Sequence, residues 1–172
     1  MAQVYVSVGS NINRYRHISS SLDALNQHFG ELLISPVYES EPVGFNGSNF
    51  FNLVVGFTCQ QALGELSALL RTIEYDHGRS RGGPKYVPRT LDIDILTYDD
   101  CVGVIDDILL PREEITENAF VLLPLVDIAG SVLHPVLQVS YADLWRDYDK
   151  SSQKLWLIDF DWCGRRISSA AS

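Results

Sequence analysis

Two aspartates separated by a single residue, Asp92 and Asp94, could do chemistry together in this sequence. They lie in the run Leu-Asp-Ile-Asp-Ile (residues 91–95), in which acidic and aliphatic residues alternate. Successive side chains of a β-strand point to opposite faces, so both carboxylates should lie on one face and the aliphatic residues on the other. Carboxylates at this spacing, about 6 to 7 Å along a strand, can bind a hard cation such as Mg²⁺.

Positive charges gather just before the two aspartates. Arg79, Arg81, Lys85 and Arg89 fall within residues 77–91, a stretch that contains no acidic residue. Guanidinium groups bind phosphate oxygens through paired hydrogen bonds. The cations and carboxylates together predict a site for Mg²⁺ and a polyphosphate. The carboxylate pair alone would also suit a strand face that is exposed to solvent, so the interpretation depends on the combination.

Strands and helices with clear apolar periodicity must position these residues. Strands are predicted over residues 4–8, 32–38, 50–57, 91–95, 102–105 and 155–162. One helix should follow the Gly9-Ser10-Asn11 turn and end at Gly30, and a second should span the apolar stripe of residues 63–73 and end near Gly78.

Three further polar features could belong to a site. Asn52 is the one polar side chain in the strand 50–57, where an amide is satisfied either by the protein or by a ligand. Glu74, near the end of the second helix, would fit a surface position or a binding site. The long loop 39–49 is rich in Pro, Gly and Asn, and the Gly82-Gly83-Pro84 segment has the composition of a flexible lid.

Composition limits the classes of function. The chain has 172 residues, 46% of them hydrophobic, and a formal net charge of −9, which predicts one globular domain and disfavours nucleic acid or an anionic membrane as a partner. The three cysteines (Cys59, Cys101 and Cys163) show neither metal-site spacing nor a disulfide pattern. With no signal peptide and no apolar run of about 18 residues, we expect a cytoplasmic protein.

The stretch from Lys85 to Leu96 resembles the pattern of the 6-hydroxymethyl-7,8-dihydropterin pyrophosphokinases, a family of the folate pathway. That pattern is a basic residue, Pro-Arg, and then an Asp-aliphatic-Asp strand. A Gly-Ser-Asn turn after the first strand, and a Glu followed by Gly-Arg-x-Arg, are also similar to the family. The resemblance covers about residues 3–148.

The resemblance implies transfer of a diphosphoryl group from ATP to the hydroxymethyl group of the pterin, with two Mg²⁺ ions and ATP as co-substrate. It implies that the metals are bound by Asp92 and Asp94, and that these act in catalysis with Arg79 and Arg89. It assigns to ATP the residues Glu74, Arg79, Arg81, Arg89, Ile95 and Arg112. It assigns to the pterin the residues Gly9, Ser40, Val43, Phe50, Asn52 and Phe120.

Three positions depart from the family pattern. Val87 replaces a small residue, Arg112 replaces a His, and Asn118 replaces an Arg. These changes leave room for a runner-up function, a non-catalytic paralogue that binds pterin or nucleotide, or a diphosphokinase for a related pterin. The two retained aspartates favour an enzyme, because a protein that only binds pterin has no need of two metal ligands.

The predicted order of elements is that of a ferredoxin-like βαββαβ fold, an α+β architecture with helices packed on a largely antiparallel sheet. We expect residues 1–172 to form a single pyrophosphokinase domain, with an extra strand over residues 151–163 and a tail over 164–172 that frays from Ser168 onward. The aromatic face of that extra strand should be covered by sheet, helix or partner. We expect a monomer that binds small-molecule substrates.

Overall fold

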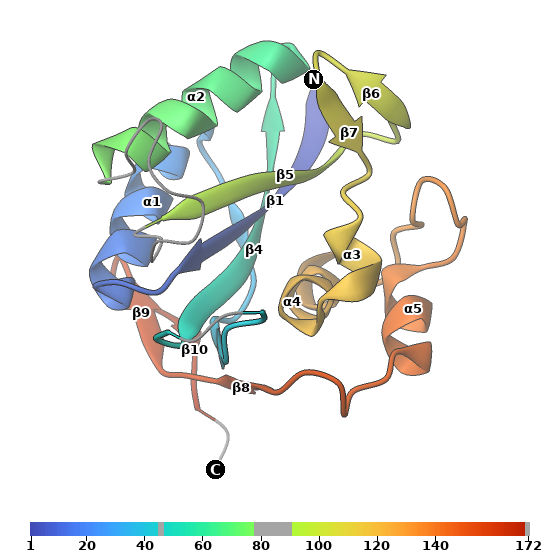
Figure 1. Ribbon diagram of the computed structural model, residues 1–172. Coiled ribbons are helices and arrows are strands. Elements are labelled where there is room, and N and C mark those ends of the chain that lie inside the picture. Colours follow the sequence, from blue (N-terminus) through green and yellow to red (C-terminus); the bar gives the residue numbers. More distant parts are fainter. Residues whose placement is uncertain (45–46, 78–90, 171–172) are drawn as a thin grey trace.

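The computed structural model describes residues 1–44, 47–77 and 91–170 (Figure 1). The helices are α1 (Arg14–Phe29), α2 (Leu63–Asp76), α3 (Glu114–Glu117), α4 (Ala119–Ala129) and α5 (Tyr141–Asp147). The strands are β1 (Ala2–Ser10), β2 (Leu33–Ile34), β3 (Tyr38–Ser40), β4 (Phe50–Cys59), β5 (Asp92–Tyr98), β6 (Gly103–Ile105), β7 (Ile108–Leu110), β8 (Leu155–Leu157), β9 (Phe160–Trp162) and β10 (Arg165–Ser168).

The main sheet has the strand order β5-β1-β4-β3-β8, with β2 also paired to β4, and every pairing is antiparallel. The chain order β1-α1-β2/β3-β4-α2-β5 confirms the predicted ferredoxin-like βαββαβ arrangement. Strand β1 lies in the centre between β4 and β5. Residues at the end of β1 are therefore flanked by both neighbouring strands.

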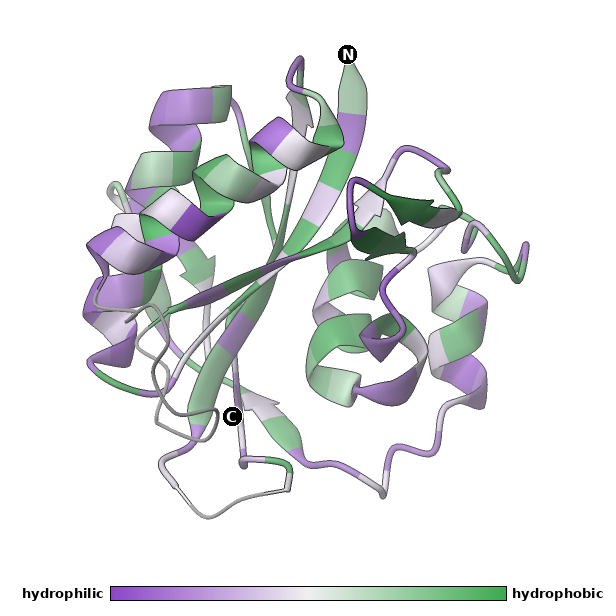
Figure 2. Ribbon diagram, turned by 45° about the horizontal axis from the view of Figure 1, so that its top comes forward, coloured by the Kyte–Doolittle hydropathy of each residue, from purple (hydrophilic) through white to green (hydrophobic). Residues whose placement is uncertain are grey.

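Helices cover both faces of this sheet (Figure 1). Apolar stripes of α1 and α2, including Leu22 and Leu66, pack on one face against inward residues such as Val6 and Ile93. Helices α3, α4 and α5 pack on the opposite face, where Val54 belongs to their core. Figure 2 shows the hydrophobic colour both along the strands of the sheet and on the helices of the two layers. None of the helices in the described ranges is long and apolar enough to cross a membrane.

The second predicted strand, 32–38, is interrupted. Strand β2 ends at Ile34 and β3 begins at Tyr38. Between them, the Ser35 backbone donates to the Val54 carbonyl at 3.0 Å, while the Val54 N–H donates to the Ser35 hydroxyl at 2.9 Å. A side chain thus replaces a backbone acceptor of the ladder just before Pro36, which has no N–H to donate.

The return strand 102–105 pairs differently from the expected hairpin. Its residues form β6, which pairs with β7 in a separate two-stranded sheet and not with β5. Gly30 ends α1 as expected, with a positive φ of 76°. Helix α2 ends at Asp76, and the Gly78 that we expected to end it lies outside the described residues.

The expected single strand 155–162 is wrong. Strand β8 joins the main sheet beside β3, with Leu157 opposite Tyr38, and the chain then turns so that β9 pairs only with β10. The expected fraying at Ser168 is also wrong, because this residue is buried. Its hydroxyl accepts from the Val37 N–H at 3.1 Å and donates to the Ile158 carbonyl at 2.7 Å.

The aromatic residues of this C-terminal region are covered by α1. The ring of Phe160 stacks on Tyr15 with centroids 4.4 Å apart, and the Trp162 indole N–H donates to Asp23 at 2.9 Å. Trp156 stays partly exposed on the sheet edge. The part of the chain beyond the short helix α5 thus pairs with the main sheet through β8 and packs against α1.

Candidate functional site

One face of the sheet is apolar at one end and polar at the other. Gly9 on β1 lies opposite Asp92 on β5 and opposite Asn52 on β4, so the three residues share a face. Asn52 is in turn opposite Tyr38, whose hydroxyl donates to Asp127 of α4 at 2.5 Å. The polar residues therefore lie on the α4 side of the sheet, beyond the apolar core that α4 covers.

Glu74 is the buried member of an acidic cluster that also contains Asp92 and Asp94. Its side chain has no exposed surface, and it accepts a hydrogen bond of 2.8 Å from the Ile93 N–H on the outer edge of β5. Its other oxygen pairs with Arg71, one turn earlier on α2, and Asp92 is hydrogen-bonded to it. Burial raises the pKa of Glu74, while the Ile93 N–H and Arg71 act to lower it. The resemblance assigns Glu74 to ATP, and that contact stays a prediction. In the structure its carboxylate is buried and is occupied by Arg71 and the Ile93 N–H.

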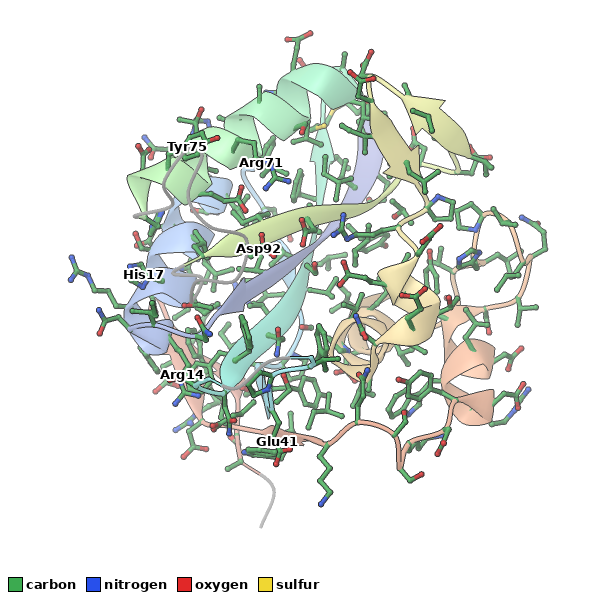
Figure 3. The ribbon with its side chains drawn as sticks, viewed as in Figure 1. Arg14, His17, Glu41, Arg71, Tyr75 and Asp92 are labelled. Atoms are coloured by element: carbon green, nitrogen blue, oxygen red, sulfur yellow. The ribbon has the colours of Figure 1, made fainter. Side chains whose placement is uncertain are left out.

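Asp94 lies between two guanidinium groups. Its carboxylate oxygens are 3.7 Å from Arg71 and 3.6 Å from Arg112, and its side chain is only 14% exposed. Burial, followed by the charge of Asp92, raises the pKa of Asp94 to about 7, although Arg112 acts in the opposite direction. Figure 3 shows Arg71 on α2 and Asp92 on β5, the two elements that enclose this cluster.

The donor set suits a hard cation that is only partly coordinated by protein. Within the described ranges, no group of three or more His, Cys, Asp or Glu side chains is arranged to hold a metal ion. Mg²⁺ usually takes one or two carboxylates and completes its shell with water and phosphate oxygens. The raised pKa of Asp94 indicates negative charge that the protein does not fully offset, and a bound cation would compensate it. Asp92 and Asp94 thus fit such an ion.

The two departures that the structure describes, Arg112 and Asn118, are connected by one carboxylate. Arg112 contacts Glu114 at 2.6 Å through a terminal nitrogen and at 2.8 Å through Nε. The Asn118 amide donates to the other Glu114 oxygen at 3.3 Å. Arg112 is therefore held by Glu114 while it points a charge toward Asp94, and Asn118 belongs to the same network.

A hollow of about 490 Å³ adjoins these charges. It is lined by Arg71, Ile95 and Arg112, among others, and it extends over Ile108 and Leu109 of β7. Its lining combines these two cationic side chains and the apolar ones with four acidic residues, Asp107, Glu113, Glu114 and Glu117. A phosphate chain would therefore lie beside Arg71 and Arg112, and a cation bound with it would offset the acidic side chains. Ile95 and Arg112 were expected on the ATP side, and the structure brings both to this hollow.

The residues expected for the pterin fall into two neighbouring groups. The Asn52 side chain is 7% exposed and donates to the Ser40 hydroxyl at 2.7 Å. A Cβ at Gly9 would approach the Asn52 carbonyl oxygen to 3.1 Å and the Phe50 ring to 3.9 Å, so glycine keeps space open over both side chains.

A second pocket, of about 200 Å³, is lined by Ser40, Val43 and Phe120. Segment 151–155 supplies its remaining wall. Ser40 belongs to both groups, because it lines this pocket and its hydroxyl accepts from the Asn52 amide. The stacking of Phe50 and Phe120 on opposite sides of one ring stays a prediction.

Some predicted site residues lie outside the described part of the chain: Arg79, Arg81, Arg89 and the Gly82-Gly83-Pro84 lid segment. Two residues that the structure adds, Arg71 and Glu114, were not predicted. Arg71 was missed, although its position three residues before Glu74 puts both on one helix face. Glu114 was missed because its contact with Arg112 depends on the turn that leads into α3.

The raised pKa of Asp94 predicts how metal-free stability changes with pH. An unfolded Asp titrates near pH 3.9, whereas folded Asp94 titrates at about 7. Between these values the folded protein holds a proton that the unfolded chain has released. Raising the pH through this window should therefore lower the free energy of unfolding, and the loss should stop above pH 7.

Thermal unfolding in EDTA from pH 5 to 8.5 checks this expectation. Relative to wild type, Asp94→Asn should lose this part of the pH dependence and be more stable at pH 8. Added Mg²⁺ should raise the wild-type Tm more at pH 8 than at pH 5.5, because the proton and the metal compete. Equal pH profiles for the two proteins would contradict the assignment.

Comparison with known proteins gives consistent matches. The family model described as 7,8-dihydro-6-hydroxymethylpterin-pyrophosphokinase (HPPK) matches residues 5–130. A 2-amino-4-hydroxy-6-hydroxymethyldihydropteridine pyrophosphokinase of Aquifex aeolicus is 34% identical over 138 residues, which cover 79% of this chain and 86% of that protein. A folate synthesis bifunctional protein of Arabidopsis thaliana is 34% identical over 132 residues, 75% of this chain but 27% of that protein.

Solved structures show the same fold. The crystal structure of wild-type Plasmodium falciparum HPPK-DHPS with pterin and p-hydroxybenzoate superposes with a TM-score of 0.70 at 16% identity, covering 88% of this chain and 43% of that one. The chain thus spans less than half of that protein and about a quarter of the plant relative. The likeness to the solved structure concerns the fold.

Proposed function

The chain belongs to the 7,8-dihydro-6-hydroxymethylpterin-pyrophosphokinase family, and on this premise we propose that it transfers the diphosphoryl group of ATP to 6-hydroxymethyl-7,8-dihydropterin. The hydroxyl oxygen forms a bond to the β-phosphorus. At the same time, the bond breaks between the β-phosphorus and the oxygen that bridges it to the α-phosphorus. AMP leaves with that oxygen, and the hydroxyl proton is released. The observation that carries the proposal is the Asp92–Asp94 pair, with Arg71 and Arg112 on either side of Asp94 and a hollow of about 490 Å³ beside them.

Each group of residues has a proposed task. Asp92 and Asp94 would hold two Mg²⁺ ions, which, when bound, neutralise phosphate charge and orient the oxygens. Arg71 and Arg112, together with Arg79, Arg81 and Arg89, would bind the phosphates, and Ile95 would contact the nucleotide. Glu74 accepts from the β5 backbone and would keep the strand and its two aspartates in register. No covalent nucleophile is needed for an in-line transfer.

The pterin is assigned to the pocket beside Asn52. We propose that Asn52 binds the edge of its ring, that Phe50 and Phe120 contact its faces, and that Gly9, Ser40 and Val43 shape its surroundings. These residues and both aspartates come from one chain, so the proposed reaction needs no second subunit. We assign the activity to residues 1–172 as one domain, because β8 continues the main sheet.

Chromatography of the nucleotide products tests this function. Incubation with ATP, Mg²⁺ and the dihydropterin should produce AMP, and omission of the pterin should abolish it. Pterin binding without AMP would instead identify a non-catalytic binding protein. AMP formation with another hydroxymethyl acceptor only would identify a related diphosphokinase.

The Arg that replaces the family's His predicts a pH effect on nucleotide binding. Arg112 stays protonated across the neutral range, whereas an imidazole with an ordinary pKa near 6.5 loses its charge there. Nucleotide affinity should be measured for wild type and Arg112→His from pH 6 to 8.5. The ratio of the two affinities cancels the ionisation of ATP, and it should shift in favour of wild type as the pH rises.

Glu114→Gln is the matched control for that experiment. It keeps the shape of the side chain that holds Arg112 but removes its charge, so the affinity ratio to wild type should stay flat with pH. A flat ratio for Arg112→His would mean that this position does not contact the phosphates. The contacts of Glu114 with Arg112 and Asn118 would then only stabilise the fold.

A further inference from the structure

The C-terminal segment beyond the family match completes the second pocket. The family model matches residues 5–130, whereas Ser151, Ser152, Gln153, Lys154 and Leu155 line the pocket of about 200 Å³. Across the pocket lie Ser40, Val43 and Phe120, to which the proposed function assigns the pterin. The segment leads directly into β8, which is fixed along β3 as the edge strand of the main sheet.

Gln153 is the residue of this segment that connects it to the opposite wall. Its side-chain oxygen accepts from the Ala119 N–H at 2.8 Å, and its side-chain nitrogen donates to the Asn118 side-chain oxygen at 2.9 Å. Ala119 is the first residue of α4, and Asn118, the residue before it, makes no side-chain cap. Gln153 therefore supplies the missing cap from 34 positions away.

The cap fixes the part of α4 that carries Phe120. Phe120 follows Ala119 directly and lines the same pocket. When no side chain accepts from an N–H at a helix start, that N–H is left to water and the first turn is held less firmly. Loss of the Gln153 acceptor should therefore loosen the turn that holds the Phe120 ring against the pocket.

We propose that Gln153 is a positioning residue for pterin binding, and that segment 151–155 forms a wall of the pterin pocket. The inference rests on the proposed function for the identity of the ligand. It also accounts for Asn118, since Gln153 and Glu114 occupy the two ends of its amide. Asn118, which departs from the family pattern, therefore links the C-terminal segment to Glu114 through hydrogen bonds.

The test compares two alanine substitutions in the C-terminal region, each of which removes a pair of side-chain hydrogen bonds. Gln153→Ala removes the bonds to Ala119 and Asn118. Ser168→Ala removes those to Val37 and Ile158, away from the pocket. Calorimetry measures the Kd of 6-hydroxymethyl-7,8-dihydropterin in the presence of Mg²⁺ and α,β-methylene-ATP, whose α–β linkage cannot be cleaved. The Tm and the Kd for the nucleotide analogue are measured for the same proteins.

We expect Gln153→Ala to weaken pterin binding about fivefold, the fold-change that corresponds to the typical cost of a lost helix cap, with the nucleotide Kd changed less than about twofold. Gln153→Glu keeps an acceptor for the Ala119 N–H and should recover part of the loss. Ser168→Ala should lower the Tm and leave the pterin Kd unchanged. Equal effects of Gln153→Ala and Ser168→Ala on pterin, or no effect of Gln153→Ala, would overturn the inference.

The same data separate this inference from the proposed function. A wild-type protein that binds pterin but forms no AMP contradicts the function, and the comparison of Kd values still decides the role of Gln153. A wild-type protein that binds no pterin overturns both.

Discussion

Replacing Asp92 or Asp94 with alanine should reduce AMP formation by at least about a thousandfold, because several kcal/mol of barrier lowering depend on the metal ligands and each 1.36 kcal/mol is a factor of ten in rate. Both carboxylates lie on the polar end of one sheet face, whereas Ile93 between them is buried in the opposite core. Removing either carboxylate should thus remove a ligand and leave the apolar packing of β5 intact.

The fold should survive these substitutions, which makes the result interpretable. Asp94→Ala relieves a buried carboxylate with a raised pKa, so the Tm at pH 8 should not fall. Asp100→Ala, at the exposed turn after the same strand, is the matched control and should keep wild-type activity. Near-wild-type turnover of either site variant at saturating Mg²⁺ would exclude Asp92 and Asp94 as the metal ligands.

Asn52→Ala should weaken pterin binding about five- to 150-fold, which corresponds to a cost of about 1 to 3 kcal/mol for leaving buried polar groups unpaired. The side chain is nearly buried, and its carbonyl oxygen faces the space above Gly9. A ring edge bound there would lose its partner, while the nucleotide, assigned to the hollow beside Arg71, would not. The Kd for α,β-methylene-ATP should therefore change much less than the Kd for the pterin.

Asn49→Ala provides the matched control for that variant. It removes the same type of side chain three positions earlier, one that donates to Glu39 at 3.1 Å. It should leave pterin binding unchanged. Equal losses of pterin and nucleotide binding in Asn52→Ala, or a loss that only accompanies unfolding, would assign Asn52 to the structure of β4 and not to the ligand.

Features encoded by neighbouring residues could be predicted from the sequence. The alternation of residues 91–95 depends on strand geometry alone, and it placed Asp92 and Asp94 on one face as observed. The Gly30 that ends α1 and the apolar stripes of both long helices depend likewise on local spacing. The order of these elements then led to the ferredoxin-like fold.

Features that depend on distant segments could not be predicted. The interruption of the strand 32–38 depends on the Ser35 hydroxyl, which accepts from β4. Residues 155–162 form two strands because they contact two different parts of the protein. Strand β8 pairs with β3, whereas Phe160 of β9 stacks on Tyr15 of α1. Arg71 and Gln153 gain their roles only when α2 meets β5 and when the C-terminal segment meets α4. No local pattern marks such contacts.

The fate of the individual phosphorus atoms tests the proposed transfer most directly. ATP labelled with ³²P at the α- or the β-position is incubated with Mg²⁺ and 6-hydroxymethyl-7,8-dihydropterin, and the products are separated. The α-label should appear in AMP and the β-label in the pterin product, in equal molar amounts, and Asp92→Ala should form neither. A β-label that stays in a nucleotide as ADP, or that appears as free phosphate or diphosphate without a pterin product, would contradict the proposed reaction.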